Sequence, residues 1–197
     1  MSNALIIVDV QPDFCENGAL PVTGGEMVAS AIASDVESRR SHYAAIITTQ
    51  DWHIDPGEHF SSTPDFVDSW PVHCVAGTPG AELHPAIADL PVDAHFAKGR
   101  FTAAYSGFEA REMLAQAPKD DESGALLGDW LRAHGITSVD VVGLAADHCV
   151  RATALDAASQ GFHTTVIAPL TAAVSREHMP HVHDELRAAG VTVLTLG

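Results

Sequence analysis

The chain has 197 residues, of which 46% are hydrophobic and 18% charged, as in a globular domain with a substantial core. Its formal net charge of −16 argues against a nucleic-acid or anionic-membrane partner, and no apolar run is long enough to span a membrane. The N-terminus lacks a basic secretory signal, and an odd set of 3 cysteines fits a reducing cytosol. We therefore expect one cytoplasmic domain over residues 1–197, as a monomer or small homo-oligomer.

Six short apolar runs are predicted to form strands. They show little polar alternation, which suits strands of a parallel sheet that are buried on both faces. The runs cover residues 4–10, 44–49, 94–97, 139–144, 164–168 and 191–196. Helical patterns lie between them, at residues 25–40, 125–134, 148–160 and 176–189. This alternation predicts an α/β fold: a single-domain, doubly wound, mainly parallel six-stranded sheet with helices on both faces.

Two segments do not follow this alternation. Residues 55–91 are rich in Pro and Gly and show little regular pattern. A loop of that length is uncommon in a compact domain and is usually functional or disordered, and because it contains histidines we expect a functional loop, a metal-binding one over about residues 51–93. Residues 116–124 are polar and charged. We expect them to form an exposed surface loop that has no part in the chemistry.

Asp51, His53, His59 and His73 are candidate metal ligands. Asp51 and His53 are two residues apart, so in an extended chain their side chains lie on the same side, and the two later histidines can fold back onto them. One carboxylate and three imidazoles suit a single divalent ion such as zinc, iron or manganese. The alternative is four solvated polar residues, which would be ordinary in a chain with 12 histidines.

Four chemically capable residues stand where predicted strands end: Asp9, Asp51, Lys98 and Cys149. In an open α/β sheet the ligand crevice lies beyond the carboxyl ends of the strands, so the fold would bring the four together. Each also has an ordinary structural explanation. The aspartates can cap turns, the lysine can be a solvated charge, and the cysteine can be a small buried apolar residue.

Cys149 is the candidate nucleophile. The passage GLAADHC, residues 143–149, predicts a tight strand-to-helix turn that places the thiol in the first helical turn. There the helix dipole and Lys98 are expected to depress the thiol pKa, and free N–H groups can hold an oxyanion. Asp9 would carry the proton. His148 is assigned a structural role, because neighbours on a helix point in different directions.

These residues, taken with their surrounding motifs, resemble the nicotinamidase/pyrazinamidase family of isochorismatase-like cysteine hydrolases, especially its actinobacterial form. The resemblance covers essentially the whole chain. It rests on ALIIVDVQPDFCENGALPVTGG, DWHIDPGEHFSSTPDF, SWPVHCVAGTPGAELHP, KGRFTAAYSGFE and VDVVGLAADHCVRATALDA. It implies an amidase that converts nicotinamide to nicotinate and ammonia, and pyrazinamide to pyrazinoate, in NAD salvage.

The resemblance also implies a role for each site residue. Asp9, Lys98 and Cys149 would be the catalytic triad, and Asp51, His53, His59 and His73 would hold one divalent metal. The pyridine carboxamide ring would lie between Phe14 and Trp70, and Tyr105 would help to close the pocket. The backbone N–H groups of Ala145 and Cys149 would form the oxyanion hole, beside a cis peptide between Leu144 and Ala145.

Three other functions remain open from the sequence. A cysteine hydrolase of a linear carbamoyl or ureido amide would share the triad but would have no obvious need for the metal ligands. A vinyl ether hydrolase of the isochorismatase type would not need the Cys149 thiol. A non-catalytic metal-binding or storage protein would leave Lys98, Asp9 and that thiol without a purpose.

Overall fold

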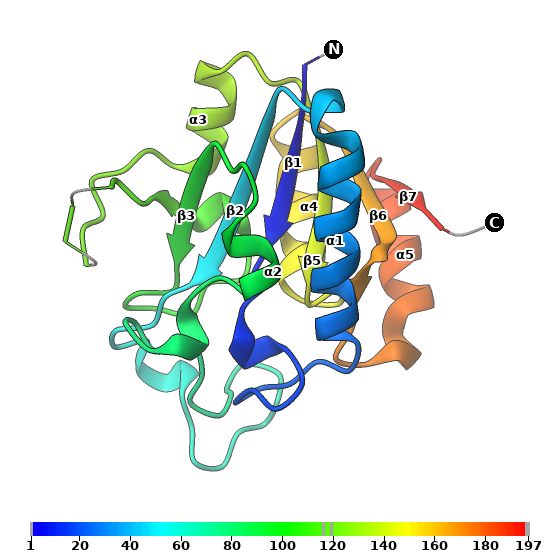
Figure 1. The fold of residues 1–197 in the computed structure, drawn as a ribbon. Coiled ribbons are helices and arrows are strands. Elements are labelled where there is room, and N and C mark those ends of the chain that lie inside the picture. Colours follow the sequence, from blue (N-terminus) through cyan, green and yellow to red (C-terminus); the bar gives the residue numbers. More distant parts are fainter. Residues whose placement is uncertain (1, 116, 119, 196–197) are drawn as a thin grey trace.

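A seven-stranded sheet runs through the middle of the molecule (Figure 1). This computed structural model describes residues 2–115, 117–118 and 120–195. The strand order is β4-β3-β2-β1-β5-β6-β7, and every neighbouring pair is parallel except β3 with β4. The strands are β1 (Asn3–Val8), β2 (Ala45–Asp51), β3 (Ala94–Lys98), β4 (Arg111–Glu112), β5 (Ser138–Leu144), β6 (His163–Ala172) and β7 (Thr192–Leu194).

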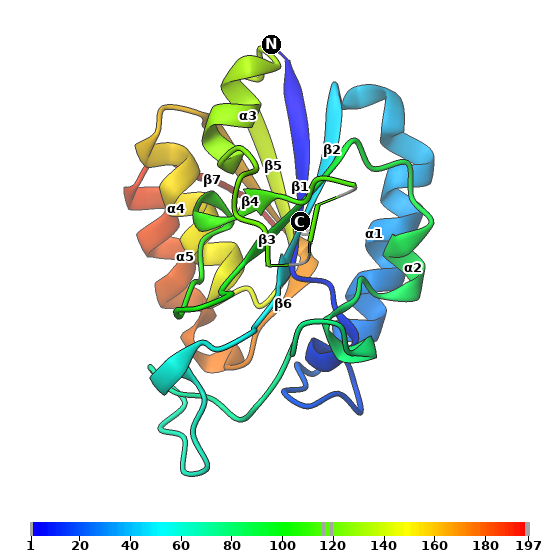
Figure 2. The ribbon, with the colours of Figure 1, turned by 90° about the vertical axis from the view of Figure 1, so that its left-hand side faces the viewer.

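Helices cover both faces of the sheet (Figure 2). On one face lie α1 (Gly25–Arg39) and α2 (Pro85–Ala88). On the other lie α3 (Leu127–Ala133), α4 (Cys149–Ser159) and α5 (Met179–Ala188). Short 3-10 helices are η1 (Pro12–Phe14), η2 (Arg40–His42), η3 (Gly57–His59), η4 (Pro79–Ala81), η5 (Gly107–Glu109) and η6 (Arg176–His178). The structure thus confirms the predicted α/β class and the helices on both faces.

The burial of β1 explains why its sequence shows no polar alternation. Ala4, Ile6 and Val8 pack in one core cluster with residues of α3, α4 and α5. Leu5 and Ile7 point to the opposite face and pack in a second cluster with residues of α1 and α2. All five side chains are fully buried. A strand between two helical layers must be apolar at every position, and the continuous run ALIIV meets that requirement.

The sheet has one strand more than the six that the sequence predicts. The added strand, β4, consists of two charged residues that pair antiparallel with β3 at the edge of the sheet. A pair of half-buried polar residues carries neither an apolar run nor a period, so pattern analysis misses it. The last predicted strand is found as β7, and its expected end at Leu196 lies outside the described residues.

The active end of the sheet is the one at which β1, β2, β3 and β5 end. The chain passes from β1 outward through β2 to β3 and later returns to β5 on the other side of β1, so the strand order reverses there. The long loop between β2 and β3 contains η3, η4 and α2 and is tied by isolated bridges, His53 to Val75 and Phe60 to Trp70.

Among the described residues, no helix has the length and apolar character needed to cross a bilayer.

The close approach of β5 to β1 at Gly143 generates a stability prediction. Gly143 has φ 112°, and a Cβ there would lie 2.1 Å from the carbonyl oxygen of Val8. We expect Gly143→Ala to lower the free energy of unfolding by about 3 kcal/mol or more, from backbone strain and overpacking together. Gly161→Ala is the matched control, because its φ of 89° is also positive but nothing lies within 4 Å of the added Cβ. Urea unfolding measures both, and equal losses would contradict the steric argument.

Candidate active site

The ammonium group of Lys98, the last residue of β3, joins the residues that end the neighbouring strands. Its Nζ lies 3.0 Å from Asp9 Oδ2 and donates to Asp51 Oδ1. It also donates to the carbonyl oxygen of Ala104 at 3.0 Å and lies 3.6 Å from Cys149 Sγ. The four strand-end residues singled out in the sequence therefore meet around one buried cation.

Burial and charge pairing set the protonation states of this group. Burial acts to lower the pKa of Lys98, but Asp51 and Asp9 outweigh it and raise that pKa well above its ordinary value. Burial acts to raise the pKa of Asp51, but Lys98 and the nearby histidines outweigh it and bring that pKa below its usual range. Burial raises the pKa of Asp9, although Lys98 opposes the rise. Charge pairing thus favours the ionised forms of Lys98 and Asp51, whereas burial makes Asp9 the carboxylate that more readily accepts a proton.

Asp9 is held in place by its backbone and by β2. It follows the last residue of β1 with φ 48°, a left-handed conformation in which aspartate is enriched among non-glycine residues. Its N–H donates to the carbonyl oxygen of Thr49 at 3.1 Å, and its Oδ1 accepts from the Thr49 hydroxyl at 2.6 Å. The carboxylate is fully buried, and its free oxygen faces Lys98 within 4.8 Å of the Cys149 sulfur. Thr49 was not identified from the sequence.

Cys149 opens α4, as predicted, but its protonation differs from the expectation. Burial raises the pKa of the Cys149 thiol well above its ordinary value, because the opposing effect of Lys98 is smaller. Asp9 and Asp51 add to the rise. The expected depression of this pKa by the helix start and by Lys98 is therefore wrong for the resting site. Burial thus favours the protonated form of this thiol, so a nucleophilic role would require a neighbouring base to remove the proton.

The turn before Cys149 is fixed by backbone hydrogen bonds. The peptide between Leu144 and Ala145 is cis, as expected from the resemblance. The carbonyl of Ala145 accepts the N–H groups of His148 and Val150, both at 3.1 Å, and this fixes the turn. Ala145 and Cys149 line the same cavity. The Val150 N–H is therefore occupied by the Ala145 carbonyl, and the N–H of Cys149, as the first of the helix, has no acceptor within the helix.

The imidazoles of His53, His59 and His73 gather beside Asp51. One ring nitrogen from each lies within 4.8 Å of the others, and all three side chains are buried. The Oδ2 atom of Asp51 is 3.7 Å from His53 Nε2 and 4.0 Å from His73 Nε2. The same carboxylate therefore faces Lys98 with one oxygen and the imidazole cluster with the other.

Hydrogen bonds behind two of the rings fix which nitrogen faces the cluster. His53 Nδ1 lies 2.6 Å from the carbonyl oxygen of Gly99, and His73 Nδ1 lies 2.7 Å from that of Pro71. Each Nδ1 therefore carries the proton, and each Nε2 presents its lone pair to the cluster. The backbone at Gly99 also comes close to the ring, since a Cβ there would lie 2.6 Å from His53 Cε1.

The cluster fits a divalent metal ion. The Nε2 atom of His53 and the Nδ1 atom of His59 are buried and find no hydrogen-bond partner among the described residues. Burial, with help from the neighbouring rings, lowers the pKa of His59 to about 4, and burial also lowers the pKa of His73. Neutral imidazoles with free lone pairs beside an ionised carboxylate are the donors that zinc, iron or manganese requires.

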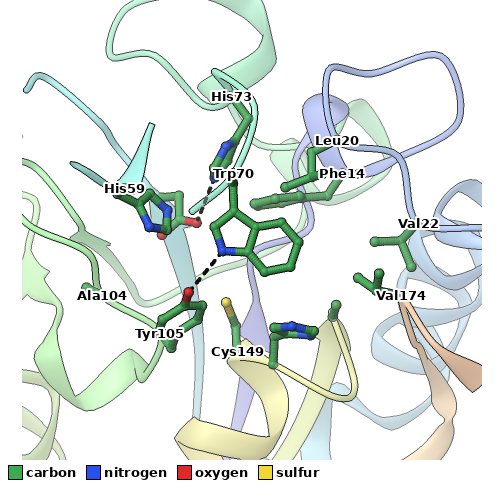
Figure 3. Close-up of a pocket in the computed structure, with 13 residues that line it drawn as sticks. Phe14, Leu20, Val22, His59, Trp70, His73, Ala104, Tyr105, Cys149 and Val174 are labelled. Atoms are coloured by element: carbon green, nitrogen blue, oxygen red, sulfur yellow. Dashed lines mark hydrogen bonds and ion pairs between the residues drawn. The ribbon is translucent and has the colours of Figure 1, made fainter. Parts of the chain in front are cut away.

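A single cavity brings the thiol and the imidazole cluster together. Figure 3 shows the Cys149 sulfur below the indole of Trp70, with His59 and His73 to one side and Val22 and Val174 to the other. The lining residues are Phe14, Leu20, Val22, Asp51, His59, Trp70, His73, Ala104, Tyr105, Ala145, His148, Cys149 and Val174.

The aromatic residues expected to bind substrate all line this cavity. Phe14, which ends η1, lies 5.5 Å from the His73 ring, centroid to centroid. The indole Nε1 of Trp70 donates to the Tyr105 hydroxyl at 3.0 Å, and that hydroxyl reaches the carbonyl oxygen of Val67 at 3.3 Å. Trp70 and Tyr105 thus form one hydrogen-bonded wall between two loops that are distant in sequence.

The structure adds neighbours that the sequence does not predict for His148 and for residues 116–124. His148 was assigned a structural role, and its ring lines the cavity and packs edge-on to Trp70 with centroids 5.1 Å apart. Residues 116–124 were expected to have no part in the chemistry, and one of them, Glu122, lines a second cavity together with Lys98. In each case the spatial neighbours come from loops, whose paths sequence periodicity does not define.

Comparison with known proteins gives a consistent result. The isochorismatase domain family matches residues 3–197. The chain is 50% identical over 191 residues to the nicotinamidase/pyrazinamidase of Mycobacterium tuberculosis, covering 97% of each chain. It resembles the pyrazinamidase of Pyrococcus horikoshii in complex with zinc, with TM-score 0.80, 32% identity and 100% of both chains covered. It also resembles L. infantum PnC1 in complex with nicotinate, with TM-score 0.81, 33% identity and 98% and 92% of the two chains covered.

The lowered pKa of His59 predicts an acid sensitivity of the metal-free protein. The unfolded chain binds the proton near the ordinary value of 6.5, whereas the folded chain binds it only near about 4. Between these values the unfolded state holds more protons, so stability present above pH 6.5 is lost as the pH falls toward 4. We expect His59→Gln to lose less stability than the wild type over this window. Urea unfolding in chelator measures the difference, and identical pH profiles would contradict it.

Proposed function

The chain belongs to the isochorismatase-domain family, and we propose that it is an amidase that hydrolyses nicotinamide to nicotinate and ammonia. Pyrazinamide, which differs by one ring nitrogen, is the second substrate, and the reaction serves NAD salvage. One observation carries the proposal: a buried thiol beside Asp9 and Lys98 opens onto the same cavity as His59, His73 and Asp51, three members of the buried imidazole and carboxylate cluster. The thiol, Asp9 and Lys98 support nucleophilic attack on an amide. The imidazoles and the carboxylate support a bound metal ion that would bind an aromatic ring nitrogen.

We assign Asp51, His53, His59 and His73 as the ligands of one divalent ion, zinc, iron or manganese. The two buried ring nitrogens without a partner among the described residues support this set. When bound, the ion supplies a Lewis acid for the ring nitrogen of the substrate, which holds the ring in one orientation. The ion therefore determines which amides are accepted, while the reaction itself belongs to Asp9, Lys98 and Cys149.

Phe14, Trp70 and Tyr105 bind the ring in this proposal. Flat apolar side chains on both sides of a pyridine ring suit stacking, and the buried positions of Phe14 and Trp70 in the cavity wall support that role. The hydrogen bond from Trp70 to Tyr105 keeps the indole from rotating away. Because His59, His73 and Cys149 line the same cavity, we place the ring nitrogen at the imidazole cluster and the carboxamide carbon at the Cys149 sulfur.

The first half of the reaction forms a thioester. Asp9 takes the proton from the Cys149 thiol, and the raised pKa of Asp9 makes it a stronger base than an ordinary carboxylate. The sulfur attacks the amide carbon, and the oxygen becomes an oxyanion that the N–H groups of Ala145 and Cys149 hold. When the intermediate collapses, Asp9 returns its proton to the departing nitrogen, which leaves as ammonia.

The second half of the reaction releases the acid. Water attacks the thioester carbon while Asp9 accepts one of its protons, and the same N–H groups hold the second oxyanion. Collapse of this intermediate breaks the carbon–sulfur bond and yields the carboxylic acid, which loses its remaining proton to solvent and leaves as the carboxylate. The thiolate then recovers the proton from Asp9. Throughout the cycle the Lys98 ammonium offsets whichever negative charge is present on Asp9 or sulfur.

The alternatives explain less of the site. A hydrolase of linear carbamoyl or ureido amides uses the triad but has no use for the buried cluster of three imidazoles. A metal-storage protein uses that cluster but leaves the buried group of Asp9, Lys98 and Cys149 without one. Only amide hydrolysis on a ring that carries a metal-binding nitrogen employs both sets at once.

We also propose that the enzyme is cytoplasmic and works as a single catalytic domain over residues 1–197, as a monomer or small homo-oligomer. The three free cysteines and the match of the family to residues 3–197 support this setting. The net charge of −16 supports a small-molecule substrate rather than a nucleic-acid partner.

Ammonia release tests the function directly. Purified protein loaded with zinc is expected to release ammonia from nicotinamide, to lose that activity on chelation, and to leave a ureido substrate unchanged. Cys149→Ala is the matched control variant, and we expect it to abolish turnover while the fold and the bound zinc remain. Absence of nicotinamide turnover at every metal loading would refute the proposed substrate, whereas full activity of Cys149→Ala would refute the nucleophile.

A further inference from the structure

The side chain of Gln11 makes a two-point contact with the backbone of Asp51. Its Oε1 accepts the N–H of Asp51 at 2.8 Å, and its Nε2 donates to the carbonyl oxygen of the same residue at 2.8 Å. The same Nε2 also donates to the carbonyl oxygen of Ala81, at the end of η4, at 2.8 Å. Gln11 is fully buried, so all three bonds are made away from water.

The Asp51 backbone needs this contact because β1 ends before it reaches the level of Asp51 in the sheet. The register of β1 on β2 stops at the pair Val8 and Thr49, and at Asp9 the chain turns away. On the other side of β2, Asp51 pairs with Lys98 of β3. There the carbonyl oxygen of Lys98 accepts the N–H of Trp52, the residue after Asp51. The N–H and carbonyl groups of Asp51 itself therefore face the gap left by β1. The carboxamide of Gln11 fills the gap with one acceptor and one donor, as a neighbouring strand would.

The position of this backbone matters because the Asp51 carboxylate faces two partners. One oxygen accepts from Lys98, and the other lies 3.7 Å from His53 Nε2 and 4.0 Å from His73 Nε2. The aspartate side chain is short, so its carboxylate can contact both partners only when the backbone of Asp51 is held in one position. A shift of Asp51 would take its oxygen away from the imidazole cluster or from the ammonium group.

We propose that Gln11 is a positioning residue of the metal site: its carboxamide replaces the missing β1 strand and holds Asp51 where its carboxylate can serve both the metal ion and Lys98. The inference rests on the proposed ligand set of Asp51 and the three histidines. Gln11 itself touches neither the metal ligands' nitrogens nor the reacting atoms, and it acts through the Asp51 backbone. Partners that orient a ligand in this way typically change metal affinity by about 10–100-fold when they are removed.

Gln50 offers a matched control. It immediately precedes Asp51 in β2, it is also buried, and its Nε2 donates to the carbonyl oxygen of Ala81 at 2.8 Å. Gln11 and Gln50 thus share an acceptor and a chemistry, but the bonds to the Asp51 backbone come from Gln11. Replacing either glutamine by methionine removes a buried amide of similar shape, and both changes are expected to lower the melting temperature.

Zinc affinity separates the two glutamines. Apo-protein of the wild type, Gln11→Met and Gln50→Met is titrated with zinc against a competing chelator, and each melting temperature is recorded without metal. We expect Gln11→Met to bind zinc about 10–100-fold more weakly than the wild type and Gln50→Met to keep the wild-type affinity. Wild-type affinity in Gln11→Met, or an equal loss in both variants, would overturn the inference.

A second variant covers the case in which Gln11→Met does not fold. Gln11→Glu keeps an acceptor for the Asp51 N–H but loses the donor to the Asp51 carbonyl, so it too should bind zinc more weakly. Wild-type affinity in this variant would overturn the inference. Failure of the wild type to bind zinc would count against the proposed ligand set itself, a result distinct from any outcome that concerns Gln11.

Discussion

The rest of the site depends on the ion pairs that the buried Lys98 ammonium forms with Asp9 and Asp51. The ammonium group lies between Asp9 and Asp51 in a place that water does not reach. An unpaired charge there would be strongly destabilising, whereas the two carboxylates repay much of its desolvation. The three groups together carry one excess negative charge, and a divalent cation on the far side of Asp51 would offset it. The proposed catalytic residues and the proposed metal ligands are therefore one electrostatic unit, which Asp51 connects through its contacts with Lys98 and with the imidazoles.

Topology explains why these residues can meet at all. Parallel strands that end on one edge of the sheet deliver Asp9, Asp51 and Lys98 side by side, and the return to β5 places Cys149 opposite them. The early turn of the chain at Asp9 points its carboxylate at Lys98, but it also removes the neighbour of Asp51. Gln11 thus supplies the hydrogen bonds that this turn removes from Asp51. In the proposed site, the placement of Asp9 for catalysis and the placement of Asp51 for metal binding depend on the same short stretch of backbone.

Features that follow from a pattern in the sequence can be predicted, whereas features that depend on burial in the packed chain cannot. Continuous apolar runs predict the buried strands, and the carboxyl-edge rule brings Asp9, Lys98 and Cys149 together without any coordinates. The edge strand β4 has no such pattern. The sign of the Cys149 pKa shift depends on burial, which is a property of the packed chain, and a buried amide such as Gln11 is indistinguishable in sequence from an exposed one. The ordinary residues that support a site therefore appear only in the structure.

In the proposed enzyme the metal ion holds the ring of the substrate, while Cys149 and Asp9 perform the chemistry. Benzamide, which has the same carboxamide but no ring nitrogen, tests this division of labour most directly. The rate constant kcat/KM is measured for nicotinamide and benzamide with zinc-loaded and metal-free enzyme. We predict that zinc raises kcat/KM for nicotinamide and leaves the much slower hydrolysis of benzamide unchanged. An equal acceleration of both substrates would contradict the account, because the metal would then act on the reaction rather than on the ring.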